Sequence, residues 1–188
     1  MKCLKMNMHL TVAIFITNGM HRMYLMCSKC FKGLKYLLRI YQNAKVFNSS
    51  MSRWDVSNAN DLSYMFHGAE SFNIAISTWD VSNVSKMLAM FKNAYAFDGG
   101  NIYYKWDVSN VSNMYEMFYG TKVFDKDLSK WSVQNVTNMK FMFYDSSIFS
   151  QSLCWDVNGK ETDDIFFGSN GGCIRSDCCP KCDVELLC

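Results

Sequence analysis

Cysteines carry the most reactive chemistry in this chain, and they gather near its C-terminus. Nine cysteines occur in 188 residues, and the last eleven residues contain four of them, Cys178, Cys179, Cys182 and Cys188. The spacing of Cys179 and Cys182 is that of a thioredoxin-like redox motif, and clustered thiolates are also zinc ligands. A redox motif requires a strand followed by a helix start, whereas this one stands in a polar tail behind two glycines. We therefore expect disulfides here, with zinc as the alternative.

Two further cysteines flank the end of the regular part of the sequence. Cys154 stands directly before Trp155, and Cys173 follows the point, at Asn158 and Gly159, where the regular pattern fails. This placement predicts a disulfide between Cys154 and Cys173 that closes the C-terminal end of the domain. Because the number of cysteines is odd, one thiol remains over. We assign no metal site and expect no cofactor.

Aspartate and serine recur in a fixed word, Trp-Asp-Val-Ser, which offers a second kind of chemistry. Stacked copies of this word align two columns of polar side chains, Asp55, Asp80 and Asp107 in one and Ser57, Ser82 and Ser109 in the other. Such columns suit a cation or a polar ligand, and Ser132 and Gln134 break them. The alternative, which we favour, is that each Asp satisfies nearby backbone amides in a turn.

Asparagine and tyrosine supply the remaining candidates for modification and binding. Three repeated sequons, at Asn83, Asn110 and Asn135, are expected to form an internal ladder bonded to backbone, too buried to be glycosylated, so Asn48 is the better acceptor. Two extra residues in the segment Gly99-Gly100-Asn101-Ile102-Tyr103-Tyr104 predict a longer loop. Exposed Tyr103 and Tyr104 there would suit ligand contact, although a tolerated insertion is the simpler interpretation.

A tandem repeat must position all of these side chains. Five tryptophans, at Trp54, Trp79, Trp106, Trp131 and Trp155, are spaced 25, 27, 25 and 24 residues apart. Similar words follow the first four, for example WDVSNVSKMLAMFKNAYAF from Trp79. Alternation in Trp-Asp-Val-Ser predicts a short strand with Trp and Val facing inward. A period of this length indicates units that stack along one axis.

The second half of each unit has apolar residues at helical spacing. Met87, Met90, Phe91 and Ala94 stand at i, i+3, i+4 and i+7, which predicts a two-turn helix. Polar residues at its start are expected to cap it, and Gly or Asn to end it, as Asn93 does here. The expected caps are Asn60, Ser85, Ser112 and Thr137. The sequence thus predicts an α/β repeat, with one short parallel strand and a two-turn helix in each unit.

The repeated words resemble the BspA-type leucine-rich repeat family of surface proteins, with Mycoplasma-type WDVSNVxxMxxMF units of about 25 residues. This resemblance implies a leucine-rich-repeat-like solenoid outside the cell that adheres to or binds a partner. It implies no catalytic residues. We expect three segments: residues 1–28, a signal peptide or degenerate capping repeat; residues 29–157, the repeats; and residues 158–188, a cysteine-rich cap and tail.

Composition and charge narrow the function further. Residues 1–54 carry nine basic and no acidic side chains, but these are spread out and lack a nucleic-acid-binding signature. No apolar run approaches the length of a membrane span, and the three histidines are scattered. We expect a non-catalytic, secreted or cell-surface adhesion module that binds a protein or glycan, with weak self-association. The alternatives are an intracellular scaffold whose cysteine tail binds zinc and a redox enzyme that uses Cys179 and Cys182.

Overall fold

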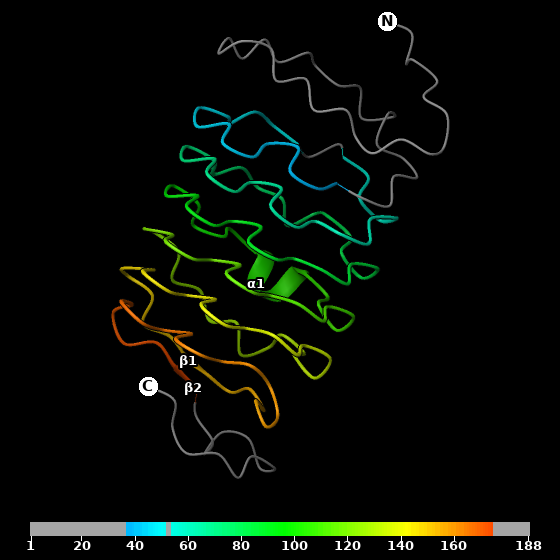
Figure 1. Cartoon of the computed structure of the whole chain (residues 1–188). Helices are drawn as coiled ribbons and strands as arrows, with labels where there is room; N and C mark the ends of the chain where they lie inside the picture. Colours follow the sequence, from blue (N-terminus) through cyan, green and yellow to red (C-terminus); the bar gives the residue numbers. More distant parts are fainter. Residues whose placement is uncertain (1–36, 52–53, 175–188) are drawn as a thin grey trace, which may run out of the picture.

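The chain winds into successive coils that stack along one axis (Figure 1). The computed structural model describes residues 37–51 and 54–174. Each coil corresponds to one sequence repeat and is named here by its opening tryptophan. Regular secondary structure within the described residues is limited to one helical turn, α1 (Ile102–Lys105), and two strands, β1 (Ser152–Leu153) and β2 (Cys173–Ile174), which pair in parallel. The predicted strand plus two-turn helix in every unit is therefore wrong.

Backbone hydrogen bonds between neighbouring coils replace the predicted helix. In the Trp79 coil the amide of Met87 donates to the carbonyl of Asn113 at 3.0 Å, and the amide of Ala89 donates to that of Tyr115 at 2.8 Å. The amides of the residues in between close local turns, as Met90 does on Met87 at 3.2 Å. Four such bonds join each pair of successive coils from Leu37 to Phe167, and we call this arrangement the four-rung ladder.

Left-handed residues explain why the helix does not form. Ala89 has a φ of 50° and Asn93 a φ of 58°, and the equivalent residues of the other coils also have positive φ. An α-helix uses its interior amides within itself. Here alternate amides face the next coil, so that a short coil gains bonds to its neighbour that a two-turn helix would lack. The expected helix caps are accordingly wrong: the hydroxyls of Ser85, Ser112 and Thr137 donate to carbonyls of the preceding coil at 3.1 to 3.2 Å.

The predicted pattern of buried residues is confirmed even though the helix is not. The four residues of the apolar stripe are completely buried in the Trp79 coil, and so are their counterparts in its neighbours. Phenylalanine rings form two parallel columns inside the stack. Phe91 stacks on Phe118 of the next coil at 5.6 Å and on Phe97 of its own coil at 3.9 Å. Burial of these rings stabilises the stack by about 2 to 3 kcal/mol for each side chain.

The coils continue beyond the expected end of the repeats at residue 157. Phe143 donates to Ile165 and Asp145 donates to Phe167, each at 2.8 Å, so the Trp155 coil completes the four-rung ladder. Phe166 also extends the phenylalanine column, 5.5 Å from Phe143. None of the helices within residues 37–51 and 54–174 has the length and apolar character of a membrane span.

Candidate binding site on the polar face

The exposed side chains of the Trp-Asp-Val-Ser-Asn words share one side of the stack, which we call the polar face. Within this face Asp and Ser of the same word bond to each other. Oδ1 of Asp80 accepts from the hydroxyl of Ser82 at 2.6 Å and from its amide at 3.1 Å. Asp55 accepts from Ser57 in the same way, at 2.6 and 3.2 Å.

The Asp107 word repeats this arrangement. Asp107 accepts the amide of Ser109 at 3.0 Å, and hydrogen bonds from the Ser109 hydroxyl and amide lower the pKa of Asp107. In all three words the favoured interpretation, an Asp that satisfies its own turn, is confirmed. These carboxylates are therefore already engaged within their own words.

A ladder of asparagines runs beside the Asp and Ser columns. Nδ2 of Asn83 donates to the carbonyl of Ser57 at 2.8 Å, and Asn110 and Asn135 make the equivalent bonds at 2.7 Å. The ladder is as predicted, but the expected burial is wrong because all three asparagines are exposed. Asn48 is also exposed and its Oδ1 accepts the amide of Asn73 at 3.1 Å. Its glycosylation stays a prediction.

The polar face changes where the word itself changes. Ser132 and Gln134 replace Asp and Ser in the Trp131 coil, and the next coil has lost the asparagine of the ladder. Lys160 takes over that role, since its Nζ donates to the carbonyls of Gln134 and Val136, both at 2.9 Å. Asp156 accepts the amide of Asn158 at 3.1 Å, but Asn158 replaces the serine whose hydroxyl donates to the Asp of an intact word.

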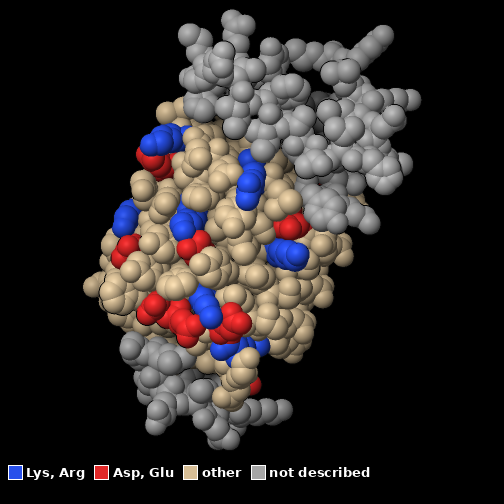
Figure 2. All heavy atoms as spheres, in the orientation of Figure 1, with Lys and Arg blue, Asp and Glu red and all other residues tan. Residues whose placement is uncertain are grey.

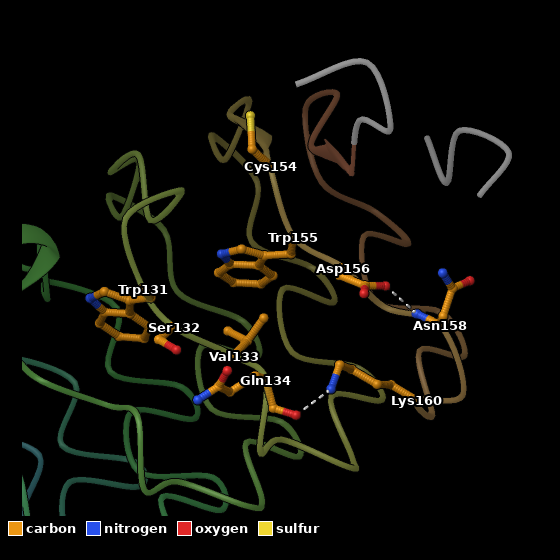
Figure 3. A pocket seen from close by; sticks show the side chains of 9 residues that line it. All are labelled: Trp131, Ser132, Val133, Gln134, Cys154, Trp155, Asp156, Asn158 and Lys160. Carbon is orange, nitrogen blue, oxygen red and sulfur yellow. Dashed lines mark hydrogen bonds between the residues drawn. The ribbon is translucent and has the colours of Figure 1, made fainter. Parts of the chain in front are cut away.

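These changed residues line a hollow of about 390 Å³ (Figure 3). We call it the break site and define it by Ser132, Gln134, Asp156, Asn158 and Lys160. Trp131, Val133, Cys154 and Trp155 complete the lining. Among the described residues, the side chains of Ser132, Gln134 and Asn158 have no hydrogen-bond partner, and all three are exposed. The break site therefore offers hydrogen-bonding groups to a ligand, whereas in the intact words Asp and Ser bond to each other.

Trp131, in the wall of the break site, is irregular in a second way. The indole Nε1 atoms of Trp79, Trp106 and Trp155 donate at 3.1 to 3.4 Å to backbone carbonyls that stand three residues before the preceding tryptophan. Nε1 of Trp131 is the one buried side-chain N or O atom without a partner in the described part of the chain.

The expected acceptor of this missing bond lies in the helical turn α1. The carbonyl of Ile76 accepts both the backbone amide of Trp79 and the indole of Trp106, and the counterpart of Ile76 in the next coil is Ile102, the first residue of α1. Because of the insertion, the backbone amide of Trp106 donates to the carbonyl four residues back, that of Ile102. The backbone amide of Trp79 donates to the carbonyl three residues back, that of Ile76. In the inserted coil this carbonyl therefore belongs to a helical turn, and the Trp131 indole does not bond to it.

The tyrosines of the predicted loop belong to α1. Tyr104 is 47% exposed, and the ammonium of Lys105 lies 5.2 Å from its ring centroid. Tyr103 is half-buried and packs against the core, with its ring 4.7 Å from that of Tyr104 in an edge-to-face arrangement. The expectation of an open loop with two exposed tyrosines is therefore wrong, and Tyr104 is the accessible one.

The cysteines do not form the predicted closing disulfide. Cys173 is a buried free thiol whose sulfur lies 3.4 Å from the hydroxyl of Ser152. Its predicted bond to Cys154 is therefore wrong. Cys178, Cys179, Cys182 and Cys188 lie outside the described residues, so their disulfides stay a prediction. In residues 37–51 and 54–174, no three His, Cys, Asp or Glu side chains group as metal ligands.

Charges of both signs are interspersed over the face that Figure 2 shows. Many pair between neighbouring coils: Lys92 with Glu116 at 2.6 Å, and Lys140 with Asp163 at 2.9 Å. This pairing neutralises charge locally. The described surface in this view therefore lacks the continuous basic area that phosphate backbones select.

Comparison with known proteins identifies the family. No curated protein and no solved structure matches the chain. The model of the family described as "Mycoplasma protein of unknown function, DUF285" matches twice, over residues 31–104 and 100–171. The two matches together span the stacked coils. The chain belongs to this Mycoplasma repeat family.

Proposed function

We propose that the protein is a non-catalytic interaction module that binds its ligand at the break site. The contrast between coils carries this proposal. In the Trp54, Trp79 and Trp106 coils the Asp side chain accepts from the Ser of its own word, whereas Ser132, Gln134 and Asn158 keep their capacity for an external partner. Local departures from an otherwise regular pattern concentrate at functional sites in proteins.

The proposed setting is the cell surface or the extracellular space. It is supported by the likeness of the repeated words to BspA-type surface proteins, which we retain as the finer family assignment. The protein isolated from its own source without reductant should show disulfides in its intact mass, two mass units lost for each. A fully reduced mass would contradict the extracellular proposal.

A variant that restores the regular word tests the binding site. Ser132→Asp with Gln134→Ser recreates Trp-Asp-Val-Ser. The new Asp should accept hydrogen bonds from the new Ser, as Asp80 does from Ser82. The variant should stay folded and lose binding in a screen against immobilised oligosaccharides and extracellular proteins.

The matched control breaks an intact word instead. Asp80→Ser with Ser82→Gln makes the reverse change two coils away and should leave binding as it is. Equal binding by the wild-type chain and the restored variant would overturn the proposal, because the break site would then make no contribution.

A further inference from the structure

We infer that the break site binds an uncharged saccharide. This inference rests on the proposed function, and it concerns the chemical class of the ligand. Three properties of the site support it: the balance of its charges, the kind of hydrogen-bonding groups it presents, and the engagement of its backbone.

The charged groups of the site cancel each other. Asp156 and Lys160 contribute one negative and one positive charge, and both already have protein partners. The Lys160 ammonium has three N–H donors, of which two are directed at the carbonyls of Gln134 and Val136. A phosphate, sulfate or carboxylate ligand would therefore meet Asp156 without an uncommitted cation to offset it. The site selects against anions.

The available groups are a hydroxyl and two carboxamides. Ser132 both donates and accepts, and the amides of Gln134 and Asn158 each offer a carbonyl oxygen and an NH₂ group. Hydroxyl groups of a sugar also donate and accept at one atom, so adjacent hydroxyls can be matched by such amides in either direction. Trp131, Val133 and Trp155 also line the site but are at most 5% exposed, so contacts to the ligand are made by the polar side chains.

The backbone of the site is already engaged, which argues against a peptide ligand. Extended peptides bind chiefly through main-chain bonds to an open strand edge. At the break site the carbonyls of Gln134 and Val136 accept from Lys160, so two of the acceptors that a peptide would use are occupied. Recognition there falls to side chains. A volume of about 390 Å³ lies at the lower end of the range for small-ligand pockets.

The experiment compares oligosaccharides with protein ligands on the same full-length chain. The probes are immobilised neutral oligomers of glucose, galactose, mannose and N-acetylglucosamine, sialylated and sulfated counterparts of the same oligomers, and a panel of extracellular proteins. Wild-type protein, the Ser132→Asp/Gln134→Ser variant and the Asp80→Ser/Ser82→Gln control are measured in parallel, with thermal unfolding to confirm that each is folded.

A neutral oligosaccharide should bind the wild-type chain and the control within about twofold of each other, and the restored variant at least about tenfold more weakly. Preference for the sialylated or sulfated counterpart would overturn the inference. Binding of a panel protein alone, lost in the restored variant, would overturn the saccharide class and leave the proposed function standing. Binding that the restored variant keeps, or no binding to any probe, would overturn both.

Discussion

Oδ1 of Asn93 occupies the space beside Gly120 in which a side chain on that glycine would stand. The same relationship joins Asn43 to Gly68 and Asp145 to Gly168. Asx and Gly therefore alternate from coil to coil at one left-handed position, and each Asx side chain fills the space beside the glycine of the next coil. The physical period of the stack is thus two coils at this position, although the sequence repeats with every coil.

Gly120→Ala should destabilise the fold by about 2 kcal/mol, because Gly120 has a φ of 69° and the added methyl group meets Asn93. Replacing Asn93 by Gly in the same chain removes the steric contact and leaves only the backbone strain. The double variant should therefore be more stable than the two single effects predict. Denaturant unfolding of the wild-type chain, Gly120→Ala, Asn93→Gly and the double variant measures this coupling. Additive effects on the free energy of unfolding would show that the two positions are independent.

Trp131→Phe should destabilise less than Trp106→Phe. Both changes remove part of a buried indole, but Trp106→Phe also removes the 3.2 Å bond from the indole to the carbonyl of Ile76, which keeps only the backbone amide of Trp79 as a donor. The Trp131 indole N–H has no partner to lose. We expect a difference of about 1 kcal/mol in the free energy of unfolding. Equal losses would mean that Nε1 of Trp131 has a bonding partner in solution.

The pair Lys92 and Glu116 should contribute more than the pair Lys45 and Glu70. Lys92 lies 2.6 Å from Glu116 and 4.3 Å from the centroid of Tyr119, and the side chains of the pair are only 22% and 14% exposed. Lys92→Ala leaves a largely buried carboxylate unpaired, so it should destabilise by about 2 to 3 kcal/mol. Lys45 and Glu70 are 67% and 37% exposed, and Lys45→Ala should leave thermal unfolding nearly unchanged. A larger effect at Lys45 would contradict this ranking.

His67 should make the fold sensitive to mild acid. Burial lowers the pKa of His67, the charges of Lys92 and Arg39 lower it further, and Glu116 acts in the opposite direction. The folded state thus resists protonation more than the unfolded state, whose histidine titrates near the ordinary 6.5. The stability from neutral His67 is complete above that value and is lost as the pH falls below it.

The His67→Gln variant isolates this contribution, because glutamine does not titrate and keeps a polar group beside Gln42, whose Nε2 lies 3.5 Å from Nδ1 of His67. Between pH 7 and pH 5 the wild-type chain should lose stability relative to the variant. Parallel stability curves for the two chains would show that His67 titrates alike in the folded and unfolded states.

The sequence predicted which residues are buried but not how the backbone bonds. Spacing of i, i+3, i+4 and i+7 identifies side chains that share one side, and Met87, Met90 and Phe91 are buried as expected. An α-helix and a row of turns satisfy that spacing equally. The residue that decides between them is Ala89, whose left-handed backbone is unusual for alanine and has no signature in the sequence. Only the second left-handed position, that of Asn93 and Gly120, could be predicted from the sequence, because Asn and Gly tolerate this conformation.

The candidate site was partly visible in the same way. Ser132 and Gln134 stand out as departures from the repeated word, and the spacing of 27 residues reveals the insertion at α1. The sequence does not show that Lys160 replaces the asparagine ladder, because a lysine there gives no sign of two carbonyl partners one coil away. Nor does it show that Nε1 of Trp131 lacks the bond that the other indoles make. Both depend on contacts between coils, which a single sequence does not list.

The four-rung ladder has a direction, and this makes the two ends of the described part of the stack, at the coil of Leu37 and at the Trp155 coil, chemically different. Every rung runs from an amide of one coil to a carbonyl of the following coil. A coil end that continues this ladder can therefore join only to the opposite end of another copy, never to its own kind. Two copies joined in this way cannot form a closed twofold dimer, because the same two unlike ends are again left outermost. Assembly through the ladder would grow as a polar filament.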